Sequence, residues 1–187
     1  MKRRQFLCLA GGAAGWVLLC GHSPYRQWIV YRETHLIILT SRDDVGADEL
    51  GEKFAAIVRA ALPESQAAVG RGPRVQRIAS LISTQQVAVG VVSRPNALAM
   101  YHGDGPFQQY GAIPLRVLVQ NDAYRLVCRD DFLPQHGFLL AEALMENGRD
   151  LALSIPGHGA IDTGDIPAHV GALAFARGRP LDLRNAQ

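Results

Sequence analysis

Two short groups of polar residues in this 187-residue chain combine hydroxyl and guanidinium groups, which suit the binding of a carboxylate or another oxyanion. Each group directly follows a run of apolar residues, 36–39 in the first case and 87–92 in the second. The candidate ligand-binding residues are Thr40, Ser41, Arg42, Ser93 and Arg94. The alternative for the first group is a solvated loop in which Arg42 pairs with Asp43 or Asp44.

The C-terminal region carries a second set of polar side chains that could bind a transition metal, because imidazole and carboxylate groups are common metal ligands. These residues are His158, Asp162, Asp165 and His169. Their spacing matches no regular metal-binding motif, and no cysteine lies among them. We therefore interpret them as helix caps and turn residues, and we expect no bound metal and no other cofactor.

Catalytic motifs are absent from the sequence. It contains neither the Gly-x-Ser-x-Gly turn of serine hydrolases nor a Gly-x-x-x-x-Gly-Lys phosphate loop. The paired acids at 43–44 and 130–131 are adjacent residues, whose side chains point apart on a strand or loop. Cys128 lies in an apolar segment and is interpreted as a packed core thiol rather than a nucleophile. We expect that the protein is not an enzyme.

The elements that position the polar groups alternate between strands and helices. Apolar residues recur at helical spacing between residues 50 and 62 and again between 75 and 82, and residues 87–92 are apolar at nearly every position. This pattern predicts an α/β fold with a mostly parallel sheet and helices on both faces. Ligands bind such sheets outside the carboxyl ends of the strands, where both polar groups should lie. Arg71 and Arg74 should lie at the same edge, as a solvated basic face.

The rest of the chain continues the α/β pattern. Residues 115–119 and 124–128 predict two strands, joined either as a hairpin or as one long bent ribbon. Residues 138–153 predict a helix, and 168–177 a last short helix. We expect one domain over residues 34–180, followed by a tail over 181–187.

The N-terminus has the features of an export signal over residues 1–23. The basic residues Lys2, Arg3 and Arg4 precede an apolar, glycine- and alanine-rich run that extends to Cys20. The paired arginines followed by Phe6 fit the form read by the twin-arginine translocase, which predicts a periplasmic protein. An uncleaved signal that anchors the protein in the membrane is the alternative, although the apolar run is shorter than the roughly 20 residues of a spanning helix.

Charge and cysteine content exclude two further classes of protein. The formal net charge is +2, and subtracting the three basic residues of the signal leaves −1. A nucleic-acid-binding surface is therefore not expected. Two of the three cysteines lie in the signal, so Cys128 is alone in the remaining chain and no disulfide framework can form.

Three ordered segments resemble the TAXI family of periplasmic solute-binding receptors, which serve TRAP transporters. The first is the strand, polar loop and helix start at 36–51. The second is the helix and strand at 74–93. The third combines Ala-Leu-Met-Glu-Asn at 143–147 with Pro-Ala-His-Val-Gly-Ala at 167–172, which looks like the family's helix and its terminal "P-x-H-P-G-A" segment. The resemblance covers most of the chain beyond the signal.

This resemblance implies a periplasmic binding protein type II-like fold reduced to a single lobe, because the chain is too short for the family's second lobe. It implies a non-catalytic transport protein that binds a small organic anion, such as a carboxylate, and delivers it to TRAP membrane subunits. The charged loop at 40–44 and Arg94-Pro95 depart from the family's pattern. The alternative is an accessory or docking module that binds a membrane or redox protein partner instead of a small ligand.

Overall fold

The structure is a computed structural model that describes residues 36–157 and 166–178. The chain divides into two units, Met1–Glu33 and Thr34–Gln187, and all described residues belong to the second. The predicted export signal and the tail at 181–187 lie outside the described residues. Within the described ranges, no helix combines the length and the apolar character that crossing a membrane requires.

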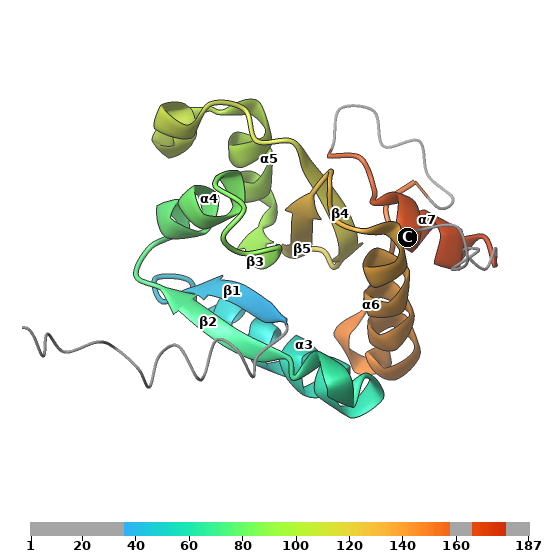
Figure 1. Ribbon diagram of the computed structural model, residues 1–187. Coiled ribbons are helices and arrows are strands. Elements are labelled where there is room, and N and C mark those ends of the chain that lie inside the picture. Colours follow the sequence, from blue (N-terminus) through green and yellow to red (C-terminus); the bar gives the residue numbers. More distant parts are fainter. Residues whose placement is uncertain (1–35, 158–165, 179–187) are drawn as a thin grey trace, which may run out of the picture. The chain divides into compact units, whose positions relative to one another are not determined.

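Five strands and five α-helices make up the described fold (Figure 1). The strands are β1 (Ile37–Ser41), β2 (Ala68–Gly72), β3 (Val89–Ser93), β4 (Leu115–Gln120) and β5 (Tyr124–Arg129). The α-helices are α3 (Val45–Ala61), α4 (Val75–Ser83), α5 (Arg94–His102), α6 (Pro134–Asn147) and α7 (Val170–Ala176). Three short 3-10 helices, η1 (Pro63–Ser65), η2 (Gly105–Tyr110) and η3 (Arg149–Leu151), lie between them.

The strands form one mixed sheet with the order β2-β1-β3-β5-β4. The strand β1 pairs in parallel with β2 and β3, whereas β5 is antiparallel to both β3 and β4. The α/β class is therefore confirmed, but a mostly parallel sheet is not, because only two of the four pairings are parallel. The chain reverses over residues 121–123 to form a hairpin of β4 and β5, and two strands joined by so short a turn must be antiparallel.

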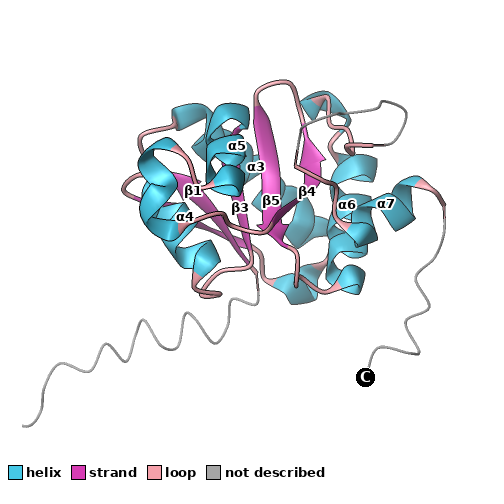
Figure 2. Cartoon of the chain, turned by 90° about the horizontal axis from the view of Figure 1, so that it is seen from above, coloured by secondary structure: helices cyan, strands magenta, loops and turns pink. Residues whose placement is uncertain are grey.

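Helices cover both faces of this sheet, as Figure 2 shows. On one face, α3, α6 and α7 bury Phe54, Leu140 and Ala172 in a cluster with Val91 of β3. On the other face, α4, α5 and η2 bury a second cluster around Val92. Neighbouring residues of β3 thus enter opposite clusters, which explains why residues 87–92 are apolar at nearly every position.

The outer edge of β4 is covered by two short segments from the C-terminal part of the chain. The backbone of Gln120 exchanges hydrogen bonds of 2.9 and 2.8 Å with Ser154. Val117 donates to the carbonyl of Pro167 at 3.0 Å and accepts from the backbone N–H of His169 at 2.8 Å. These bonds satisfy an edge strand that would otherwise expose its hydrogen-bonding groups.

The expected helix at 138–153 is displaced in the structure. Helix α6 begins at Pro134 and ends at Asn147, and η3 follows from Arg149. Proline suits the first turn of a helix because its missing N–H is not needed there. Gly148 takes the position after the last helical residue and donates its N–H to the carbonyl of Leu144. The apolar spacing had continued beyond this end.

Candidate ligand-binding site

The five predicted ligand residues lie at one edge of the sheet, where β1 and β3 end side by side. These strands are parallel neighbours, with Leu39 opposite Gly90. From β1 the chain leaves to α3 on one face, whereas from β3 it continues into α5 on the other. Open α/β sheets bind ligands at such a point, where successive connections diverge. We call this the carboxyl edge, meaning the ends of β1, β2 and β3 with the start of β5.

Thr40 and Ser41 point to opposite faces of the sheet because they are consecutive strand residues. Thr40 faces α3, is fully buried, and donates its hydroxyl proton to Asp48 at 2.7 Å. Ser41 is 1% exposed and donates to the carboxylate of Asp43. Both hydroxyls therefore already have partners within the protein.

Arg42 is different, because its side chain is exposed and its guanidinium has no hydrogen bond or ion pair with any described residue. Only its backbone is held, through an N–H that donates to the carbonyl of Gly72 at 2.9 Å. The alternative pairing with Asp43 or Asp44 is not formed among these residues. Arg42 thus combines a fixed backbone with an uncommitted guanidinium, meaning one that makes no hydrogen bond or ion pair with a described residue and acts on Asp48 only through its charge.

Ser93 and Arg94 lie beside Arg42's loop at the end of β3. Ser93 is half-buried and lies opposite Tyr124 of the antiparallel strand β5. Arg94 is exposed, and its backbone N–H donates to the carbonyl of Ala123 at 2.9 Å. Two exposed arginines therefore follow two adjacent parallel strands.

Asp44 and Tyr124 form a connection across the carboxyl edge that the sequence patterns did not reveal. The Oδ1 atom of Asp44 accepts from the hydroxyl of Tyr124 at 2.8 Å and from the backbone N–H of Ala47 at 3.1 Å. The hydrogen bond to this carboxylate, followed by burial, raises the pKa of Tyr124. An aspartate before a segment of periodic apolar residues is a helix N-cap signal, so the cap at Asp44 could be predicted from the sequence. The bond between Asp44 and Tyr124 could not be predicted in this way, because no sequence pattern joins the two residues.

The loop leaves no room for a larger side chain beside this bond. A Cβ atom on Gly46 would lie 2.3 Å from the Tyr124 hydroxyl oxygen. The backbone of the loop that follows Arg42 is therefore packed closely against Tyr124 of β5.

The two further arginines expected at this edge differ in their contacts. Arg71 forms ion pairs with Asp48, at 2.9 Å, and with Glu52. The hydrogen bond from Thr40, together with Arg71 and the charge of Arg42, holds the pKa of Asp48 below its usual value despite partial burial. Arg74 is exposed at the N-cap of α4 and makes no side-chain cap bond.

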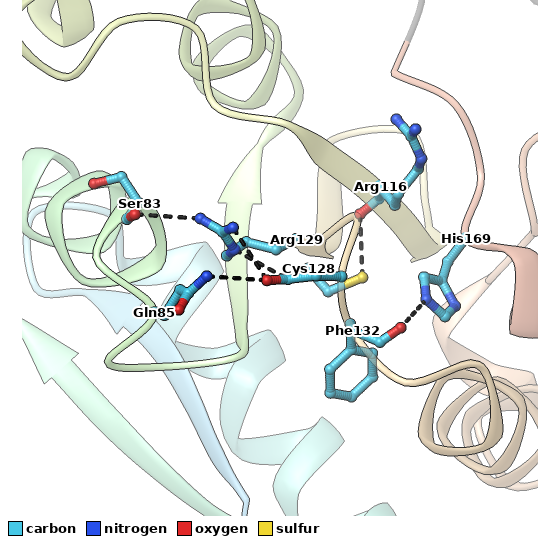
Figure 3. Close-up of polar contacts among 8 residues, drawn as sticks. Ser83, Gln85, Arg116, Cys128, Arg129, Phe132 and His169 are labelled. Carbon is cyan, nitrogen blue, oxygen red and sulfur yellow. Dashed lines mark hydrogen bonds and ion pairs between the residues drawn. The ribbon is translucent and has the colours of Figure 1, made fainter. Parts of the chain in front are cut away.

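At the opposite edge of the sheet, arginine and acid residues are paired (Figure 3). Arg129 makes two bonds to Asp131, at 2.9 and 3.1 Å, and a third to the carbonyl of Ser83 at 3.2 Å. The Asp131 carboxylate also accepts from Gln85 at 3.1 Å. These contacts connect β5 to the C-terminal end of α4, so this edge is structural.

Cys128 lies in the core, in agreement with its interpretation as a packed thiol. It is fully buried, and its thiol donates to the carbonyl of Arg116 with a sulfur-to-oxygen distance of 3.7 Å (Figure 3). Burial raises the pKa of this thiol well above its usual value. A thiolate nucleophile is therefore disfavoured at this position.

Of the four residues considered as metal ligands, His158, Asp162 and Asp165 lie outside the described residues. His169 is the N-cap of α7 and accepts a hydrogen bond from the backbone N–H of Gly171, as the interpretation as a cap predicts. Residues 36–157 and 166–178 contain no group of three or more side chains placed to hold a metal ion.

The chain matches no known protein-family model and no curated protein. Its class is that of an α/β protein with a mixed five-stranded sheet and an arginine-bearing carboxyl edge.

Proposed function

We propose that this chain is an exported, non-catalytic solute-binding-like protein of the TAXI type, which binds a small organic anion such as a carboxylate at the carboxyl edge. In this proposal Arg42 supplies the main charge, with Thr40, Ser41, Ser93 and Arg94 around it, and TRAP membrane subunits receive the ligand. The periplasm is the proposed location, reached through the twin-arginine translocase.

The observation that carries the proposal is the uncommitted guanidinium of Arg42. Its acidic neighbours already have partners, since Asp43 accepts from Ser41 and Asp44 from Tyr124. Guanidinium groups bind carboxylates through two parallel hydrogen bonds. The position between two parallel strands whose connections diverge is where α/β sheets bind ligands.

The roles within this site are unequal. Ser41 and Thr40 already donate to aspartates, so in this proposal they set the shape of the loop rather than contact the ligand directly. Arg42 supplies the guanidinium that binds the ligand carboxylate, and Arg94 adds positive charge at the same edge.

A thermal-shift screen with mono- and dicarboxylates tests this proposal. A ligand at about 100 times its dissociation constant should stabilise the protein by about 2.7 kcal/mol. The Arg42→Ala variant should bind about tenfold more weakly, the lower end for a charged hydrogen bond, because the side chain is exposed to screening water. Arg74→Ala is the matched control and should bind as the wild type does. Equal affinities for the wild type and Arg42→Ala would exclude Arg42 as a ligand residue.

A docking module is the second candidate, favoured by one observation at the same edge. Val45, three residues after Arg42, is an apolar side chain with 67% of its surface exposed. Arginine is enriched in protein–protein interfaces, and the exposed valine would add apolar area to such a contact.

The two candidates predict different results for the neutral variant Val45→Ser. A docking module should show no thermal shift with carboxylates, and Val45→Ser should weaken recovery of its partner from a periplasmic extract. A carboxylate receptor should instead keep its ligand affinity in Val45→Ser, because this substitution adds no charge beside Arg42.

A further inference from the structure

His169 is a buried titratable side chain at the junction of α6, α7 and β4. It is 1% exposed, and its backbone continues the segment that pairs with the edge of β4. Its imidazole Nε2 lies 2.8 Å from the carbonyl oxygen of Phe132 (Figure 3), and its Nδ1 lies 3.2 Å from the backbone nitrogen of Gly171. One ring therefore connects the loop before α6 with the first turn of α7.

The two partners determine the protonation state of the ring. A carbonyl oxygen only accepts hydrogen bonds, so Nε2 must carry a proton. A backbone N–H only donates, so Nδ1 must be unprotonated to accept from Gly171. The neutral imidazole with its proton on Nε2 satisfies both bonds. A second proton, on Nδ1, would face the N–H of Gly171 and remove the helix cap.

Two glycines allow α6 and α7 to pack closely around the ring. A Cβ atom on Gly137 of α6 would lie 2.1 Å from the Nδ1 atom of His169. A Cβ atom on Gly171 of α7 would lie 2.1 Å from the carbonyl oxygen of Pro134. Loss of the bond between the imidazole and Gly171 should therefore loosen the packing of α7 on α6.

The charged groups around the ring do not favour a cation. Burial is the largest cause of the lowered pKa of His169, and the positive charge of Arg116 on β4 lowers this pKa further. The hydrogen bond to Phe132 raises the pKa and so opposes both effects. From α6, His136 is exposed and reaches His169 only through the ring of Phe132.

The nearest loop offers no countercharge either. Asp130 and Asp131 precede α6 and are both exposed, and Asp131 is held by Arg129 and Gln85. Neither carboxylate bonds to the imidazole. A protonated His169 would therefore be a buried cation without an acidic partner among the described residues.

We propose that His169 is an acid-sensitive latch, whose protonation releases α7 from α6 and frees residues 167–169 from the edge of β4. Release would expose the apolar surface that Leu140 and Leu144 of α6 share with Ala172 of α7. Histidine suits this role because it is the side chain that ordinarily titrates between about pH 5 and 8.

The direction of the pH response depends on the neutral folded form. Burial lowers the pKa of His169 in the folded state, so the unfolded chain binds the proton more tightly. The latch is therefore fully closed above the ordinary histidine pKa of about 6.5, and it weakens as the pH falls below that value.

Hydrogen exchange measured by mass spectrometry at about pH 7.5 and about pH 5 tests the latch, after correction for the intrinsic effect of pH on exchange. In the wild type, amide protection of Val170–Ala176 should fall about tenfold or more at the lower pH, whereas that of β1 and β3 should not change. Unchanged protection of α7 across this range would overturn the proposal.

Three variants separate the latch from general acid sensitivity. His169→Asn retains a good N-cap but cannot titrate, so α7 should be equally protected at both pH values. His136→Asn, at a neighbouring exposed histidine, should respond as the wild type does. Gly137→Ala should displace the ring and reduce the protection of α7 even at the higher pH.

Loss of α7 protection in His169→Asn at low pH, equal to that of the wild type, would contradict the latch. If this variant does not fold, NMR of the wild-type histidine rings provides an independent test. The spectrum should show His169 with its proton on Nε2 at neutral pH and a pKa below the ordinary histidine value of about 6.5. A proton on Nδ1 instead would overturn the proposal.

Discussion

The tripeptide Arg-Asp-Asp occurs twice in this chain, after β1 at 42–44 and at the end of β5 at 129–131, and its two copies do opposite things. At 129–131 the arginine binds the second aspartate and the end of α4. At 42–44 the second aspartate caps α3 and accepts from Tyr124, so the arginine is left without a partner among the described residues. The same three residues thus form a structural clamp at one edge and an uncommitted charge at the other.

The difference comes from the elements next to each copy. A helix begins directly after Asp44, and its first N–H groups compete for that carboxylate. Beyond Asp131, the next helix, α6, begins only at Pro134, so Asp131 remains available to Arg129. A short motif therefore indicates its residues' chemistry, but the neighbouring elements decide which of them pair.

Among variants at the two Arg-Asp-Asp copies, Asp44→Ala should have the largest effect on the free energy of unfolding. This substitution removes the cap of α3 and the partner of Tyr124 together, and we expect it to lower the free energy of unfolding by about 2 kcal/mol. Urea unfolding monitored by circular dichroism measures the loss. Tyr124→Phe, which removes only the second bond, should cost about 1 kcal/mol. A loss below about 0.5 kcal/mol for Asp44→Ala would contradict the assigned role of this carboxylate.

Arg129→Ala should have the next largest effect. It removes the bond to the end of α4 and the ion pair with a half-exposed carboxylate, so we expect a loss of about 1–2 kcal/mol. The same urea titration measures it. Asp130→Ala, next to the clamp, is the control and should change the free energy of unfolding by less than about 0.5 kcal/mol.

Acid should remove the contribution of this clamp. The hydrogen bonds from Arg129 lower the pKa of Asp131 in the folded state, so the stabilisation is complete above the unfolded value of about 3.9 and is lost as the pH falls below it. The difference in stability between the wild type and Arg129→Ala should therefore shrink between about pH 5 and about pH 3. A constant difference over this range would show that the ion pair contributes nothing.

The smallest expected effect on stability is that of Arg42→Ala. Because its guanidinium makes no hydrogen bond or ion pair with a described residue, we expect a change within about 0.5 kcal/mol in the absence of ligand. A loss as large as that of Arg129→Ala would mean that Arg42 is a second structural clamp. The contrast between the two arginines would then disappear.

Much of the fold could be predicted from the sequence, because its strands are short apolar runs and its helices have regular apolar spacing. The direction of β5 could not be assigned, since a hairpin and a bent ribbon give the same pattern. The candidate residues at the carboxyl edge were placed correctly at strand ends. Their pairing was not predictable, because the bond between Asp44 and Tyr124 joins residues 80 positions apart. Helix α3 begins at Val45, directly after its N-cap Asp44, whereas the regular apolar spacing begins only at Leu50.

The environments of the two arginines can be compared in one experiment by NMR of their Nε–H groups during a titration with succinate. The signal of Arg42 should move saturably as the ligand binds, whereas that of Arg129 should stay in place because its Nε is already bonded to Asp131 at 2.9 Å. Lack of any movement of the Arg42 signal, or equal movement of both signals without saturation, would contradict anion binding at the carboxyl edge.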